Sequence, residues 1–419
     1  MGFKINAFTG GLEIDYSQLK ELVEDISNAA KSLANKISDA RKRKQIVEFH
    51  TYRGLLVSNR RLAAILAGLY YRDDFKIMDY KIPLLYRDEW IPPTPIDLRE
   101  VRLEWLFHKE FTFDKSIFAE EDISPFGERR YSSLQLELVE NIRLYNDPTY
   151  RLMKVENKEN CHMLRFGLDT YFNYMDTCEL LAYEFCKEVV KSMETDVEFS
   201  ADSIKDRFKL SLRSQIDPFD FSNRSAAAGI NTILIVLDNN QTSKFYLHER
   251  SATEVAEGIN TISVVPSGTF QPRHKRDAYH SQDFDLYTNL LREFAEELLG
   301  VGEFRNLTAK LTDIFEIEIL KEIDYFVRKG LIKVYYLGIS LDCLTTKPEI
   351  LTALVLEREI IDTFLRKDFA DCFEGENFEI EFSIGQLKSF KEDERIMPAG
   401  AACLWLVEKN FKLFRDIER

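Results

Sequence analysis

The chain has no apolar run that approaches the roughly 18–20 residues needed to cross a bilayer. Its first residues, MGFKINAFTGGLEIDY, do not show the basic start and apolar block of a signal peptide. The six cysteines are scattered and form no CxxC pair, so we expect free thiols in a reducing compartment. These absences predict a cytoplasmic protein without a membrane segment.

Two common catalytic motifs are also missing. The sequence has no G-x-x-x-x-G-K-[ST] phosphate loop and no G-x-S-x-G elbow, which excludes P-loop nucleotide binding and the serine nucleophile of α/β-hydrolases. Basic residues are fewer than acidic ones, 56 against 71, and the net charge is −15. This charge argues against a nucleic-acid partner, whereas a nucleotide held with a divalent metal stays compatible with it.

Apolar material is abundant enough for large cores, since 45% of the residues are hydrophobic and 31 are Phe. Residues 16–72 carry apolar side chains at near-helical spacing and predict helices. Three prolines in EWIPPTPIDL, from Glu89, predict a linker or an extended crossing. Residues 101–158 show a mixed, weak pattern, and residues 171–193 predict a long helix.

The pattern changes after Gly229. INTILIVL is a β-branched run that predicts a strand, and KFYLHER predicts a second strand paired with it in a hairpin. Further strands are predicted at NTISVVPSGTF, IKVYYLGISLDCL, EILTALVLE and FEIEFSI, and a closing helix at PAGAACLWLVEKNFKLF. The sequence therefore predicts an α+β fold in three segments: a helical N-terminal region 1–88, a mixed α/β segment 89–222, and a third segment 223–419.

Three glutamates converge in the stretch LLREFAEELLG. Glu293, Glu296 and Glu297 lie at i, i+3 and i+4, so they share one face of a helix whose other face is apolar. They are either the solvated face of an ordinary helix or a carboxylate cluster for a hard cation such as Mg²⁺. Arg292 is either a surface pairing partner or a residue that holds one of these carboxylates.

These residues carry a family resemblance. REFAEE resembles the R-E-apolar-x-E-E core of the box that defines Nudix hydrolases, VVPSGTF resembles the turn before the box, and KFYLHERS resembles the family's second strand. The likeness covers residues 228–410 and implies a Nudix-like α/β/α sandwich with a mixed sheet. A wider likeness, over residues 90–410, is to uncharacterised bacterial proteins with such a C-terminal domain.

The resemblance implies roles for individual residues. Glu293, Glu296 and Glu297 would bind Mg²⁺ or Mn²⁺, Glu293 would also orient the attacking water, and Arg292 would hold a glutamate in place. Arg250 at the strand end and Gly268 in the turn would meet the substrate.

The sequence departs from the family pattern in two places. The stretch between Gly268 and Arg292 is about ten residues longer, and Phe284 stands where the first glutamate of the box belongs, with Asp283 and Asp285 beside it. These departures leave a catalytically weak nucleotide sensor, controlling the N-terminal region or a partner protein, as the alternative to an enzyme.

The inserted loop contains the basic stretch RHKRDAYH. Arg273, Lys275 and Arg276 are expected either to meet substrate phosphates ahead of the acidic helix or to form a solvated loop. His274 and His280 lack partners at metal-finger spacing.

The leading expectation is metal-dependent binding, with hydrolysis, of a nucleoside diphosphate-linked compound. The sequence leaves open a purely structural interaction protein, and it also leaves open a homodimer.

Overall fold

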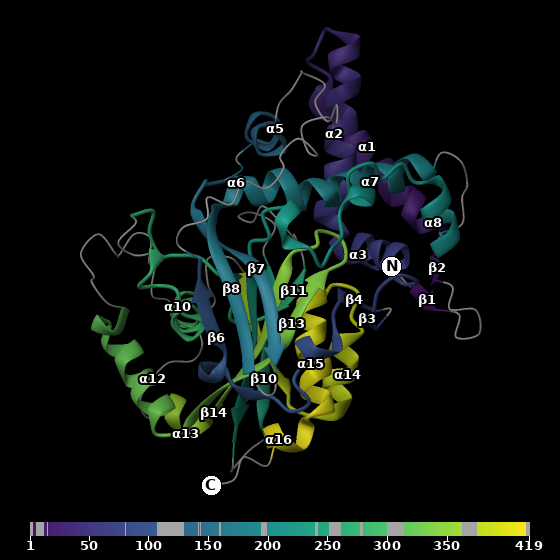
Figure 1. Ribbon diagram of the computed structural model, residues 1–419. Helices are drawn as coiled ribbons and strands as arrows, with labels where there is room; N and C mark the ends of the chain where they lie inside the picture. Colours follow the sequence, from purple (N-terminus) through teal and green to yellow (C-terminus); the bar gives the residue numbers. More distant parts are fainter. Residues whose placement is uncertain are drawn as a thin grey trace.

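The computed structural model describes residues 3–5, 12–14, 16–79, 81–106, 130–140, 142, 144–158, 161–193, 199–238, 242–250, 261–276, 280–299, 314–362 and 375–415. A large twisted sheet runs through the centre, helices lie on either side of it, and a group of helices formed by α1, α2, α3, α7 and α8 lies at one end (Figure 1). The predicted α+β class is confirmed.

The helices of the described residues are α1 Tyr16–Ala34, α2 Ala40–Ser58, α3 Arg60–Tyr71, α5 Tyr131–Leu138, α6 Tyr171–Tyr174, α7 Leu180–Met193, α8 Ala201–Arg207, α10 Leu286–Leu298, α12 Glu318–Arg328, α13 Arg358–Ile360, α14 Ile384–Lys391, α15 Pro398–Lys409 and α16 Phe411–Arg415. Short 3₁₀ turns are η1 Asp88–Trp90, η2 Leu98–Glu100, η4 Arg213–Gln215, η5 Phe221–Asn223 and η6 Ile314–Glu316.

Ten strands of the described residues form the main sheet, in the order β11-β10-β9-β14-β13-β4-β3, with β12 and β15 beside β9 and β10 and β5 beside β13. Their bounds are β3 Ile77–Asp79, β4 Ile82–Leu85, β5 Ile96–Asp97, β9 Gly229–Leu237, β10 Lys244–Arg250, β11 Ile262–Val264, β12 Ser267–Thr269, β13 Ile332–Asp342, β14 Pro348–Glu357 and β15 Gly375–Glu381. The sheet is mixed, because β9 and β14 are parallel and the other paired strands run antiparallel.

The central strand β9 explains why its sequence is a continuous apolar run. Ile233 and Ile235 belong to the core on one face of the sheet, and Leu234 and Val236 belong to the core on the other. Successive side chains of a strand point to opposite faces, so a strand covered on both sides needs apolar residues at every position. The predicted strand at 230–237 is confirmed.

Different elements cover the two faces of the sheet. Helix α15 packs on the face of Ile233 and contacts β4, β9 and β14. Its small residue Gly400 permits close approach, since a Cβ there would lie 3.3 Å from the backbone nitrogen of Val264. The opposite face carries α10 and a three-stranded sheet of β6 Arg102–Trp105, β8 Cys161–Thr170 and β7 Pro148–Lys158 (Figure 1).

The N-terminal helices match the predicted helical region 16–72. Helix α2 begins where the Asp39 side chain accepts hydrogen bonds from the backbone of Arg41 and Lys42. The predicted helix at 171–193 is also present, although it contains a π-helical segment, Met175–Glu179, between α6 and α7. Arg60 of α3 forms a buried ion pair with Glu179 and joins this helix to the N-terminal region.

The three predicted segments share the core on the α10 face of the sheet. Strands β3, β4 and β5 come from residues 77–97, yet they extend the sheet of the third segment by pairing with β13 or with each other. The buried Arg213 donates to the backbone oxygen of Cys343 at 2.9 Å. This hydrogen bond connects the middle segment to the residue that follows β13. In the long hairpin β7–β8, strand β7 lies in the stretch 101–158 where the sequence showed only a mixed, weak pattern, and no strand was predicted at β8.

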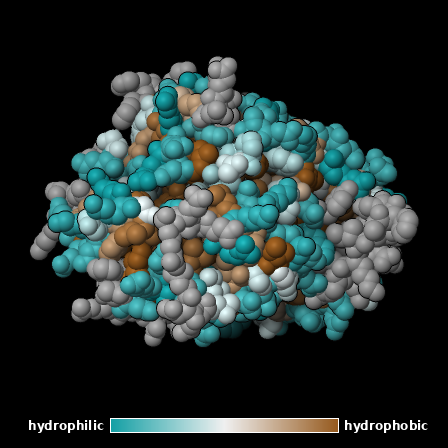
Figure 2. All heavy atoms as spheres, turned by 90° about the horizontal axis from the view of Figure 1, so that it is seen from below, coloured by the Kyte–Doolittle hydropathy of each residue, from teal (hydrophilic) through white to brown (hydrophobic). Residues whose placement is uncertain are grey.

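Exposed large apolar side chains are scattered. Figure 2 shows one face, on which apolar residues form small separate groups among hydrophilic ones. The most exposed are Leu33, Leu136, Tyr145, Leu168, Tyr325, Leu331 and Ile384. They come from different elements, and single exposed apolar residues are ordinary on a protein surface. No described helix is both long enough and apolar enough to cross a membrane.

Candidate functional site

The predicted acidic helix is α10. Asp285 caps its first turn by accepting a hydrogen bond from the backbone of Thr288 at 2.7 Å. Leu290 and Phe294 are buried on the side that packs toward the main sheet, and burying one such side chain contributes about 1.5–3 kcal/mol. The helix contacts β9 and β12, so its position relative to the sheet is fixed.

The turn at residues 265–271 lies directly against this helix. Strand β12 pairs with β9, and this places Gly268 opposite Ile230. A Cβ added to Gly268 would overlap the carboxylate of Glu293. Only glycine therefore leaves room for this carboxylate, and two residues 25 positions apart in the sequence meet at that contact.

Arg292 is bound at the same junction. Its guanidinium donates to the backbone oxygen of Gln271 at 3.1 Å, to Asn289 Oδ1 at 2.8 Å and to Glu293 Oε1 at 3.2 Å. Burial alone would lower the pKa of Arg292, but the charges of Glu293 and Glu296 outweigh it and raise that pKa. The contact of Arg292 with one of the glutamates is as predicted.

Glu297 faces the turn. Its side-chain Oε2 accepts a hydrogen bond from the backbone nitrogen of Ser267 at 2.8 Å, and the residue is 8% exposed. Its backbone oxygen accepts from Asn377 of β15 at 3.3 Å. Glu297 thus joins α10 to the turn and to the edge of the sheet, and at least one of its carboxylate oxygens has a structural task.

The three glutamates do not form a closed metal cage. Among the described residues, no group of three His, Cys, Asp or Glu side chains is arranged to hold a metal ion. Two of the carboxylates are engaged in hydrogen bonds instead: Glu297 accepts from the Ser267 backbone and Glu293 accepts from Arg292. Glu293 and Glu296 are both partly buried on the same side of the helix.

Mg²⁺ or Mn²⁺ that arrives with phosphate needs fewer protein carboxylates than a closed cage provides. Mg²⁺ keeps several waters and is commonly bound by one or two carboxylates together with substrate phosphates, rather than by a complete protein cage. Glu293 and Glu296 are the residues that would provide those carboxylates. The predicted role of Glu297 as a third ligand stays a prediction, and its Oε2 is bound to the Ser267 backbone.

The described part of the inserted loop, residues 271–276 and 280–282, is only partly solvated. Arg273 is buried, with its Nε 3.1 Å from Asp283 Oδ1, and its backbone nitrogen donates to Asp283 Oδ2 at 2.8 Å. Lys275 is exposed and lies 2.9 Å from Asp147 Oδ1, and Arg276 is exposed. Lys275 and Arg276 stay accessible to a ligand, whereas Arg273 has a structural partner. The side chain of Arg250 lies outside the described residues.

Two residues of the site were not predicted. Asp283 holds the loop through its ion pair with Arg273. The only sequence signal for Asp283 was its position next to Phe284, where the first glutamate of the box belongs. Asn289 accepts from Arg292 and from the backbone of Gln271, while its buried Nδ2 has no hydrogen-bond partner among the described residues. Its spacing of four from Glu293 on one helix was the available signal.

The bond between Glu297 and Ser267 gives a stability prediction. Glu297→Gln keeps an oxygen acceptor for the buried backbone N–H of Ser267, so we expect little change in the free energy of unfolding. Glu297→Ala leaves that N–H unsatisfied and should cost about 1–3 kcal/mol. Urea unfolding of both variants measures the difference. Equal stability of the two variants would contradict the anchoring role.

Comparisons with known proteins add no relative: no protein-family model matches the sequence, and no curated protein resembles it significantly.

Proposed function

We propose that the junction of α10 and β12 binds a nucleoside diphosphate-linked compound together with Mg²⁺ or Mn²⁺, and that it hydrolyses the diphosphate linkage. The observation that carries the proposal is the contact of Gly268 with the Glu293 carboxylate beneath an anchored turn. The Nudix resemblance requires this turn and this helix to meet, although the sequence separates them by an insertion.

The charges of α10 and of the loop that precedes it suit a diphosphate. Glu293 and Glu296 supply the carboxylates for the cation, which would neutralise the phosphates and lower the pKa of a bound water. The exposed cations of Lys275 and Arg276 come from the loop that leads from Gln271 back to α10. Arg292 orients Glu293 through their hydrogen bond at 3.2 Å.

A second function, a nucleotide sensor with weak or no catalysis, is favoured by Glu297. In the resemblance Glu297 is a metal ligand, but here its Oε2 already accepts from Ser267. A site with one ligand fewer would bind the metal–nucleotide complex and activate water less well. In that case the ligand would alter the coupling of this junction to the N-terminal helices or to a partner.

The experiment is a screen of nucleoside diphosphate derivatives with Mg²⁺ or Mn²⁺, which records both the shift in melting temperature and the release of phosphate products. Metal-dependent stabilisation with product supports hydrolysis, and stabilisation without product supports the sensor. Glu24→Gln on the exposed face of α1 is the control variant. A panel that neither stabilises the protein nor is hydrolysed would refute both functions.

Gly268→Ala tests the junction without removing a charged group. The added methyl must displace the Glu293 carboxylate, which is the flexible end of a side chain, so folding should survive. We expect a loss of about 1–3 kcal/mol in the free energy of unfolding, but a much larger relative loss of turnover or of metal-dependent binding. Gly385→Ala is the matched control, because a Cβ there meets no atom within 4 Å. Normal activity of Gly268→Ala would show that Glu293 has no part in the site.

A further inference from the structure

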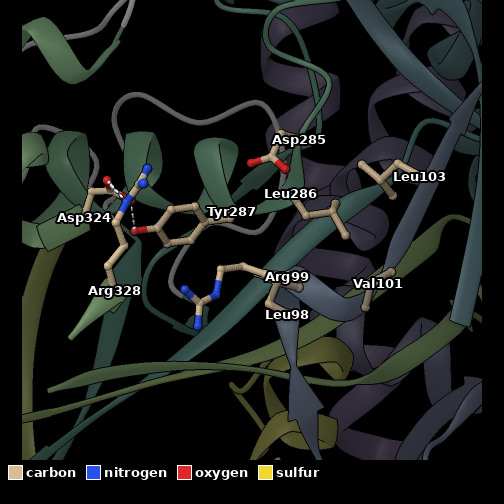
Figure 3. A pocket seen from close by; sticks show the side chains of 9 residues that line it. All are labelled: Leu98, Arg99, Val101, Leu103, Asp285, Leu286, Tyr287, Asp324 and Arg328. Atoms are coloured by element: carbon tan, nitrogen blue, oxygen red, sulfur yellow. Dashed lines mark hydrogen bonds and ion pairs between the residues drawn. The ribbon is translucent and has the colours of Figure 1, made fainter. Parts of the chain in front are cut away.

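A separate pocket of about 340 Å³ opens beside the first turn of α10. Three elements line it: the stretch from η2 to β6, the start of α10, and α12 (Figure 3). Its lining residues are Leu98, Arg99, Val101, Leu103, Asp285, Leu286, Tyr287, Asp324 and Arg328. The volume is within the range of about 300–1,000 Å³ that is typical of small-molecule sites.

The pocket has an apolar end and a charged end. Leu103, Val101 and Leu286 lie together on one side, and Arg328 and Asp324 lie on the other, with the ring of Tyr287 between them (Figure 3). Arg99 projects along the floor toward the charged end. A ligand that fills this pocket would have an apolar body and a polar head.

The acids of the charged end already have partners. Asp324 accepts from the Tyr287 hydroxyl at 3.2 Å through Oδ1 and from Arg328 Nε at 2.7 Å through Oδ2. Asp97 likewise accepts from Arg99 Nε at 2.9 Å. These acids therefore hold the two arginines in place.

The arginines retain unused donors. Among the described residues, Arg99 Nη1 and both terminal nitrogens of Arg328 have no hydrogen-bond partner. A guanidinium presents its donors in a planar fork that matches carboxylate and phosphate oxygens. The start of α10 lies at the same pocket, but its first turn is already capped by the Asp285 carboxylate, so the two arginines are the groups that would recognise an anion.

We infer that this pocket binds an amphipathic anion, a carboxylate or phosphate head on an apolar body, through Arg99 and Arg328. The site is distinct from the α10–β12 junction. It lies at the first turn of the helix, while Glu293 and Glu296 lie about two and about three turns further along. It needs neither a metal nor a nucleotide.

Calorimetric titration with octanoate, octyl phosphate and octanamide, without metal or nucleotide, tests the inference. We expect saturable binding of at least one anion, at least roughly tenfold tighter than octanamide, because charge-assisted hydrogen bonds are lost in the neutral compound. The ratio of octanoate to octyl phosphate affinity identifies the preferred head group. Equal affinity for octanamide, or no saturable binding of either anion, would overturn the inference.

Two variants and one control locate the binding. Arg328→Gln is the first, because its side chain is 72% exposed and its loss leaves the core intact. Arg99→Gln is the second, and both should weaken anion binding roughly tenfold while leaving octanamide unaffected. The control is Arg102→Gln, an exposed neighbour on β6 that does not line the pocket. Unchanged anion affinity in both pocket variants, or an equal loss in the control, would overturn the assignment.

Discussion

Asp283→Ala should lower the free energy of unfolding by about 3–5 kcal/mol, because it removes the carboxylate that is paired with the buried Arg273 cation. Both side chains of the pair are nearly inaccessible, with 2% of Arg273 and 4% of Asp283 exposed. Asp283 also accepts the backbone N–H of Arg273, so its removal breaks the anchor of the inserted loop. Urea or thermal unfolding measures the loss, and the exposed Asp25→Ala in α1 should be close to neutral.

A double replacement separates the ion pair from simple packing. Burial raises the pKa of Asp283 in spite of the neighbouring Arg273 and Arg292, so ionising this carboxyl group is less favourable than in water. Arg273→Met with Asp283→Leu removes both charges and should therefore cost less than Asp283→Ala alone. If the double variant loses as much free energy of unfolding as Arg273→Met and Asp283→Leu lose together when measured singly, the two charges are not coupled.

Glu293→Gln should produce the largest functional loss. If the junction hydrolyses a diphosphate linkage, removing the carboxylate that orients the water should reduce turnover by about 10²–10⁴-fold. The amide keeps the volume and one acceptor for Arg292, so the fold and much of the ligand affinity should remain. Steady-state turnover and ligand-induced stabilisation, measured on the same preparation, give the comparison.

A second substitution distinguishes the loss of metal affinity from the loss of turnover. Glu296→Gln removes a carboxylate from the same side of α10 and should mainly weaken metal affinity, which more Mg²⁺ would restore. Glu24→Gln should leave both quantities unchanged, since it lies on a different helix. Hydrolysis that survives Glu293→Gln combined with Glu296→Gln would place the chemistry elsewhere in the chain.

Local patterns predicted most of the sheet and the longest helices. The run around Ile233 reads as a strand because both of its faces are covered, and α10 reads as a helix because its apolar residues recur on one side. The sequence did not predict the hairpin β7–β8, because not all of its buried positions are apolar. Its buried positions include Arg151, whose charge is compensated by partners such as Asp169 and the backbone oxygen of Phe221. Such partners, distant in sequence, leave no periodic signal.

In the candidate site, too, helical spacing predicted the local contacts, while contacts between residues distant in sequence were missed. Helical spacing placed Glu293, Glu296 and Glu297 on one side of α10, and the Arg292–Glu293 contact follows from it. The hydrogen bond of Glu297 depends on where the Ser267 backbone lies, and the burial of Arg273 beside Asp283 depends on the path of the inserted loop. Neither position is determined by the residues nearest to it in the sequence.

Calorimetric titration with the nucleoside diphosphate derivative that stabilises the protein most tests the central claim most directly. It compares the wild type, with Mg²⁺ and with a chelator, and the Glu293→Gln, Glu296→Gln double variant. Our account predicts saturable binding that needs Mg²⁺ in the wild type and is at least roughly tenfold weaker in the double variant, with Glu24→Gln unaffected. Binding that is equally tight with chelator, or equally tight in the double variant, would contradict a metal–nucleotide site at the junction of α10 and β12.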